Sequence, residues 1–165
     1  MPAAPFRTIT APTETATAAF ARRLAPALGP GDTLLLSGPI GAGKTHFARA
    51  LIQERLAAAG RAEDVPSPTF TLVQTYDDGK TEIWHADLYR LTDAGDLWEL
   101  GLDEAFDTAI CLVEWPDRLG TAAPAGALWI DIATDDADGR RLSLSSDAPA
   151  WPARIDAALA ERADA

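Results

Sequence analysis

Apolar residues near the start of the chain recur at every fourth position, which is the spacing of one face of a helix. The pattern predicts a helix that follows Thr13, contains Pro26 near its end and stops at the Gly-Pro-Gly sequence of residues 29–31. The buried stripe of this helix consists of Phe20, Leu24 and Leu28. A short edge strand over residues 6–10 is expected before it.

A continuous apolar run and a second helical pattern follow, with a glycine-rich sequence between them. Residues 33–37 (TLLLS) are typical of a buried strand, and residues 45–59 predict a helix that Gly60 ends. Phe47, Leu51 and Leu56 are available for the inner side of this helix. The order strand, glycine-rich loop, helix is the setting in which phosphate-binding loops occur.

The second half of the chain predicts shorter elements. Two β-rich segments, residues 70–76 and 81–88, flank the turn Asp-Asp-Gly-Lys and indicate an antiparallel hairpin. The remaining pattern predicts a helix over residues 94–106, strands over 109–113, 127–133 and 141–145, and a closing helix over 151–163. We therefore expect a single α/β domain over residues 1–165, with three layers and a mixed β-sheet that has helices on both faces.

Charge and composition narrow the class of protein. The net charge is −11, and no basic run is longer than two residues. A protein that grips nucleic acid by itself normally presents a basic face, so strong autonomous binding to nucleic acid is disfavoured. An acidic surface suits a basic protein partner, although solubility alone also explains it. The lone Cys111 and the lack of a leader or a long apolar stretch predict a cytoplasmic protein that does not associate with membranes.

Residues 38–45, G-P-I-G-A-G-K-T, match the phosphate-binding pattern G-x-x-x-x-G-K-S/T at every position. Glycines let successive backbone N–H groups face one anion, and the following helix adds its positive end. Lys44 is expected to reach the β- and γ-phosphates, and the Thr45 hydroxyl is expected to ligate Mg²⁺. The loop predicts a P-loop NTPase-like fold and a nucleotide site formed by Gly38, Pro39, Ile40, Gly41, Ala42, Gly43, Lys44 and Thr45.

Such a loop needs an acid for the metal, and two carboxylates are candidates. Glu114 ends an apolar strand, where ligands of α/β sheets lie, although a plain surface glutamate would also fit. Asp87 shares one strand face with His85, and an ion pair with Arg90 or another arginine is the alternative reading. His85 itself fits either proton transfer or a hydrogen-bonded structural role.

Several further residues have open roles. The hydroxyls of Ser67 and Thr69 lie in a stiff S-P-T segment and could sense the γ-phosphate, or simply form a turn. His46 directly follows the loop and could contact the nucleotide or only pack at the surface. Trp115 could pack under the site, and Arg140 could reach a phosphate or be solvated.

Four segments occur together in order: G-P-I-G-A-G-K-T, V-P-S-P-T-F-T-L-V, W-H-A-D-L-Y-R-L and I-C-L-V-E-W-P. This set resembles the bacterial TsaE family (formerly YjeE), the small ATPase of tRNA threonylcarbamoyladenosine synthesis. The resemblance extends from the first helix to about Arg141. Pro39 and His46 depart from residues common in the family, and neither change removes a phosphate donor.

The resemblance implies slow hydrolysis of ATP to ADP with Mg²⁺. It also implies work with the TsaD–TsaB pair, which modifies adenosine 37 of tRNAs reading ANN codons, so that tRNA is met only through the complex. By position, Thr45 and Glu114 correspond to the metal ligands, Asp87 to the aspartate of the family's H-x-D-L-Y-R segment, and residues 67–70 to a switch-like loop. Asp87, Glu114 and Thr69 are therefore the catalytic candidates. Thr13 and Glu14, together with Gly139 and Arg140, correspond to stretches near the nucleotide.

Two other functions remain compatible with the loop. A P-loop small-molecule kinase would need an arginine-bearing lid, and the short Pro-bound segment after residue 59 argues against one. A non-hydrolytic binding module would use ATP only to order the S-P-T segment. The chain has no N-K-x-D guanine-reading motif, which favours ATP over GTP.

Overall fold

The computed structural model describes residues 4–68, 71–93, 95–135 and 139–163, and within them seven strands form one mixed sheet of order β1-β7-β6-β2-β5-β4-β3. The strands are β1 Arg7–Ala11, β2 Thr33–Ser37, β3 Val73–Asp77, β4 Glu82–Asp87, β5 Ile110–Glu114, β6 Leu128–Thr134 and β7 Arg140–Ser145. The helices are α1 Glu14–Leu24, α2 Lys44–Ala58, α3 Asp96–Leu100, α4 Leu102–Thr108 and α5 Trp151–Ala163, with 3₁₀ turns η1 Ala25–Ala27 and η2 Pro116–Ala122.

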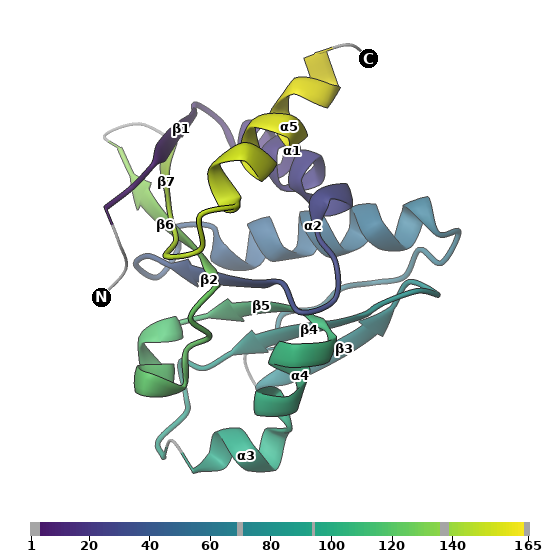
Figure 1. Ribbon diagram of the computed structural model, residues 1–165, viewed down its shortest axis with the longest axis vertical. Helices are drawn as coiled ribbons and strands as arrows, with labels where there is room; N and C mark the ends of the chain where they lie inside the picture. The colour runs from purple at the N-terminus through teal and green to yellow at the C-terminus, as the bar shows by residue number, and fades with distance from the viewer. Residues whose placement is uncertain (1–3, 69–70, 94, 136–138, 164–165) are drawn as a thin grey trace.

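The centre of the sheet is parallel, since β2 pairs with β5 and β6 and β4 pairs with β5 in that sense. The edges are antiparallel through the β3–β4 hairpin and through β1, β7 and β6. Helices α1, α2 and α5 cover one face of the sheet, and α3 and α4 cover the other (Figure 1). The expected three-layer α/β architecture is confirmed.

Each face of the sheet has its own apolar core. The strand residues Leu34, Leu36 and Leu112 pack toward α1 and α2, together with Phe20 and Phe47. The alternate residues Leu35, Cys111 and Val113 pack toward α3, α4 and η2, as period-two alternation requires. Strands β2 and β5 are therefore apolar on both sides over most of their length, which fixes these two strands and the loops at their carboxyl ends.

Two helix predictions were wrong in detail. The first helix ends at Leu24 instead of continuing to residue 28, because Pro26 supplies no backbone N–H, and residues 25–27 form the 3₁₀ turn η1. The helix expected over residues 94–106 is two short helices joined at Gly101, whose φ of 80° interrupts the helical backbone.

The strand expected from residue 70 begins at Val73, after Leu72 adopts a φ of 68°. Residues 69 and 70 lie outside the described part of the chain. Within the described residues, no helix combines the length and the apolar character that a bilayer span requires.

Candidate nucleotide-binding site

The glycine-rich loop connects the end of β2 to the start of α2 and needs glycine at both of its ends. Gly38 has a φ of 143°, and a Cβ atom there would lie 2.4 Å from the carbonyl oxygen of Ile132. Gly43 has a φ of 109° at the N-cap of α2. A side chain at either position would strain the backbone, so these glycines fix the path of the loop over the helix N-terminus.

Lys44 lies over the loop, with only 5% of its surface exposed. Its Nζ donates to the carbonyl oxygens of Gly38 at 2.6 Å and Pro39 at 2.9 Å and lies 4.1 Å from the ring centroid of Trp115. Burial lowers the pKa of Lys44, and the carboxylates of Glu114, Asp87 and Asp131 oppose that shift. Since burial disfavours the ammonium, an incoming anion close to it would favour the charged form.

Glu114 ends β5 and is the most enclosed carboxylate of the site, with 2% exposure. Thr45 Oγ1 donates to Glu114 Oε1 at 2.7 Å, and His85 Nε2 lies 2.7 Å from Glu114 Oε2. An ionised carboxylate only accepts hydrogen bonds, so this pairing with an ionised Glu114 requires the proton on Nε2. His85 Nδ1 is buried and has no hydrogen-bond partner in the described residues.

Asp87 is the neighbour of Glu114 in the parallel register of β4 and β5. It is 5% exposed, and its Oδ1 accepts from the backbone N–H of Tyr89 at 3.0 Å. A cleft of about 390 Å³ joins the loop to both carboxylates. Its lining consists of Ile40, Gly41, Gly43, Lys44, Thr45, His46, Asp87, Tyr89, Glu114 and Trp115.

The donor set of this cleft suits Mg²⁺. Hydroxyl and carboxylate oxygens from Thr45 and Glu114 converge, with Asp87 on the next strand. Mg²⁺ prefers oxygen ligands and usually takes the rest of its shell from phosphates and water instead of a full protein cage. The described residues contain no group of three or more His, Cys, Asp and Glu side chains placed to hold a metal by themselves.

Arg140 holds the loop from its outer side. Its Nε donates to the carbonyl oxygen of Ala42 at 2.7 Å, and its Nη2 donates to that of Gly41 at 3.3 Å. Its Nη1 also donates to the carbonyl of Gly139. Neither Gly139 nor Arg140 lines the cleft, so the geometry gives Arg140 a role in shaping the loop.

The residues at the start of α1 touch the site through a histidine. Thr13 caps α1 by accepting from the Ala16 N–H at 3.1 Å. His46 Nε2 lies 3.0 Å from the backbone carbonyl oxygen of Glu14 and thereby connects α1 to α2. Thr13 and Glu14 are exposed and do not line the cleft, whereas His46 does.

The S-P-T segment is only partly described. Ser67 is exposed, and Thr69 lies outside the described residues, so its proposed switch role remains a prediction. The contact between His85 and Glu114 did not follow from the sequence reasoning. The sequence feature that could have predicted this contact is the strand alternation. It puts His85 and Asp87 on one face of β4, next to the strand that ends at Glu114.

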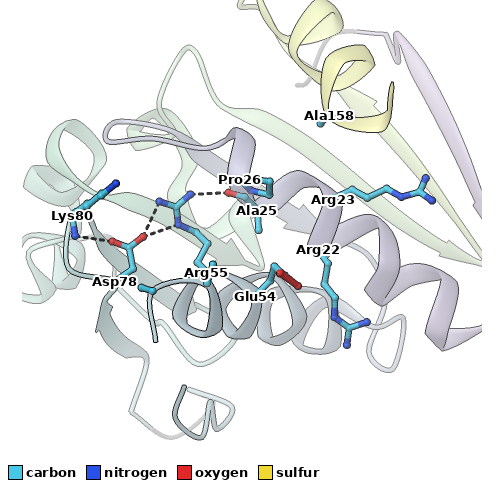
Figure 2. A pocket seen from close by; sticks show the side chains of 11 residues that line it. Arg22, Arg23, Ala25, Pro26, Glu54, Arg55, Asp78, Lys80 and Ala158 are labelled. Carbon is cyan, nitrogen blue, oxygen red and sulfur yellow. Dashed lines mark hydrogen bonds and ion pairs between the residues drawn. The ribbon is translucent and has the colours of Figure 1, made fainter. Parts of the chain in front are cut away.

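A second hollow, of about 360 Å³, lies near the far end of α2 and has a structural charge pair on its wall (Figure 2). Arg55 donates through Nε and Nη2 to Asp78 Oδ2 at 3.0 and 2.8 Å. Its Nη1 donates to the carbonyls of Ala25 and Leu28. The guanidinium therefore joins the β3–β4 turn to η1.

We expect Arg55→Ala to lower the free energy of unfolding by about 3 kcal/mol, because it leaves the largely buried Asp78 carboxylate without its cation. Arg61→Ala is the matched control, since Arg61 and Asp77 are exposed and 3.8 Å apart, and a change within about 0.5 kcal/mol is expected. Urea unfolding of the two variants and the wild type measures both. Equal losses would contradict this role of Arg55.

The same pair gives a pH dependence. Burial alone would raise the pKa of Asp78, but the backbone N–H groups of Lys80 and Thr81 and the Arg55 guanidinium outweigh it and hold that pKa below 3.8. The contribution of Asp78 to stability is therefore present above this ordinary value and is lost as the pH falls through the lower folded-state pKa.

The family comparison settles which P-loop family this is. The model of the family described as threonylcarbamoyl adenosine biosynthesis protein TsaE matches residues 11–142. The chain belongs to the TsaE family. The match spans the start of α1, the glycine-rich loop, Asp87, Glu114 and Arg140, so every part of the site described above lies within it.

Individual TsaE proteins agree with this assignment. The tRNA threonylcarbamoyladenosine biosynthesis protein TsaE of Rickettsia bellii is 34% identical over 128 residues, covering 78% of this chain and 87% of its own length. The Bacillus subtilis protein of the same name is 37% identical over 131 residues, covering 79% and 75%. The crystal structure of Bacillus subtilis YdiB superposes with a TM-score of 0.76 at 28% identity and covers 96% of both chains.

Proposed function

We propose that the protein binds ATP with Mg²⁺ in the cleft at the glycine-rich loop and hydrolyses it slowly. The observation that carries the proposal is the convergence of Lys44, Thr45 and Glu114 at that loop within a member of the TsaE family. The hydrolysis would support TsaD and TsaB in placing threonylcarbamoyl on adenosine 37 of tRNAs that read ANN codons. With a net charge of −11, this subunit would meet tRNA only through those partners.

Each group in the cleft has a chemical task in this proposal. Lys44 and the loop amides hold the phosphates, and Thr45 and Glu114 hold Mg²⁺. The metal ion, when bound, neutralises charge on the β- and γ-phosphate oxygens. His85 keeps the Glu114 carboxylate turned toward Thr45 through the 2.7 Å contact to its other oxygen. Asp87 positions or activates the attacking water.

Asp87→Asn is expected to lower the rate of ATP hydrolysis about 100-fold and to leave the Kd for MgATP within about threefold, because a general base contributes to the reaction more than to ground-state binding. Phosphate release and nucleotide titration measure the two quantities. Asp77→Asn, a change of the same kind at the exposed end of β3, is the control. A variant that hydrolyses ATP at the wild-type rate would remove Asp87 from the chemistry.

Phosphate release with and without the TsaD–TsaB pair tests the function as a whole. The proposal predicts slow release by the protein alone and faster release with the pair. Release at background level under both conditions would favour a non-hydrolytic nucleotide-dependent module. Transfer of the γ-phosphate to a metabolite, detected as a phosphorylated product, would favour a small-molecule kinase.

A further inference from the structure

A groove that the nucleotide site does not use lies between α3, α4 and η2. Helices α3 and α4 are on the sheet face opposite α2 (Figure 1). It has a volume of about 540 Å³. Its floor is formed by Leu97, Leu102 and Leu119, which are at most 5% exposed, and its walls include Trp98, Phe106 and Pro124. We call this feature the α3–α4 groove.

Trp98 is the unusual member of the groove because 69% of its surface is exposed. An indole left in water on a five-residue helix contributes little packing to the fold. Tryptophan is also the residue type most enriched among the side chains that dominate protein–protein binding energy. The combination of an exposed indole with an apolar floor therefore marks a surface suited to receiving an apolar side chain.

The charged side chains that line the groove are both acidic, and the chain around them is acidic between Arg90 and the exposed Arg118 on η2. Residues 91–117 contain eight aspartates and glutamates and no lysine or arginine. Five of the eight lie on the two helices beside the groove: Asp96, Glu99, Asp103, Glu104 and Asp107. Asp103 and Asp107 line the groove itself, and none of the five forms a salt bridge with any described residue.

We propose that the α3–α4 groove docks a protein partner that inserts an apolar side chain beside Trp98 and places lysine or arginine against the surrounding carboxylates. Charge complementarity selects this occupant. Nucleic acid and anionic lipid carry phosphates that the aspartates would repel, and a second copy of this chain brings a net charge of −11. A protein segment that carries both basic and apolar side chains complements the carboxylates and the apolar floor of the groove.

The groove is connected to the cleft along the chain. β4 ends at Asp87, and the segment after it leads to α3, which carries Trp98. β5 ends at Glu114, and η2 starts two residues later and brings Leu119 to the groove floor. A partner in the groove would thus contact both segments that present carboxylates to the nucleotide. Docking is therefore coupled to ATP hydrolysis, and this part of the inference rests on the function proposed above.

Binding and phosphate release with the purified TsaD–TsaB pair test the inference. Trp98→Ser should raise the Kd for the pair about tenfold or more and reduce its stimulation of phosphate release, while phosphate release by the protein alone stays unchanged. The double variant Asp103→Lys, Asp107→Lys should weaken binding similarly and reduce its dependence on salt concentration. The double variant Glu63→Lys, Asp64→Lys, an equal charge change at two exposed positions beyond the end of α2, is the control and should bind as the wild type does.

The outcomes separate this surface from the proposed function. If the wild type binds the pair and Trp98→Ser and the double variant bind equally well, the groove is not the docking site, and the accessory role stands. If the wild type does not bind the pair, both the accessory role and the groove assignment fail. A wild-type dimer that Trp98→Ser converts to a monomer would replace the basic partner with a second copy and overturn the proposal. Thermal melts of each variant confirm that it is folded.

Discussion

Lys44→Ala is expected to abolish ATP binding at any practical concentration, with a Kd at least about 100-fold higher than that of the wild type. Lys44 is the lysine that lines the cleft, and only 5% of its surface is exposed. Its ammonium group is directed at the loop. Two charge-assisted hydrogen bonds to phosphate oxygens in such a place contribute about 3 kcal/mol or more, which corresponds to a factor of about 100.

The chain supplies its own control for this substitution. Its only other lysine, Lys80, lies on the exposed β3–β4 turn, so Lys80→Ala makes the same chemical change outside the cleft and should leave the Kd unchanged. Isothermal titration with ATP and Mg²⁺ measures all three proteins. Wild-type affinity in Lys44→Ala would contradict the assignment of the glycine-rich loop as the phosphate site.

Glu114→Gln should slow the hydrolysis of ATP about 100-fold and make the remaining rate independent of Mg²⁺. The Kd for ATP without Mg²⁺ should stay within about threefold of the wild-type value. Glutamine preserves the size of the side chain but removes the negative charge, and its amide keeps only one oxygen that can accept a hydrogen bond from Thr45 or His85. The neutral side-chain amide of glutamine is a poor ligand for Mg²⁺. The phosphates can still bind Lys44 and the backbone N–H groups of the loop.

Two titrations, with Mg²⁺ and with a chelator, separate metal binding from nucleotide binding in this variant. Glu54→Gln on α2, which makes the same substitution away from the cleft, is the control and should keep the wild-type response to Mg²⁺. If Glu114→Gln hydrolyses ATP at the wild-type rate with the same requirement for Mg²⁺, Glu114 is not the metal acid.

Local sequence signals were sufficient for most of the architecture. The continuous apolar run Thr33–Ser37 and the closing helix Trp151–Ala163 match their predicted bounds, since in each case polar or turn-forming residues flank a clear pattern. The helix break at Gly101 was missed because apolar residues continue on both sides of it. A single glycine within a helical pattern does not reveal whether its φ is positive.

The residues of the site could be predicted from the sequence more readily than the contacts between them. Glu114 and His85 were each recognisable as candidates, but their 2.7 Å contact depends on β4 lying beside β5 in a parallel register. Strand neighbours that are far apart in sequence are set by the packing of the whole sheet, and no local pattern encodes them. The same holds for Arg140, which reaches the carbonyl of Ala42 across 98 residues.

Reconstitution of threonylcarbamoyladenosine synthesis from the TsaD–TsaB pair, a threonylcarbamoyl donor and tRNA tests the central claim most directly. The account predicts that repeated turnover requires the wild-type protein and ATP, and that Lys44→Ala cannot replace it although Lys80→Ala can. Modification that continues through many turnovers equally well without the protein, or with Lys44→Ala in its place, would contradict the account.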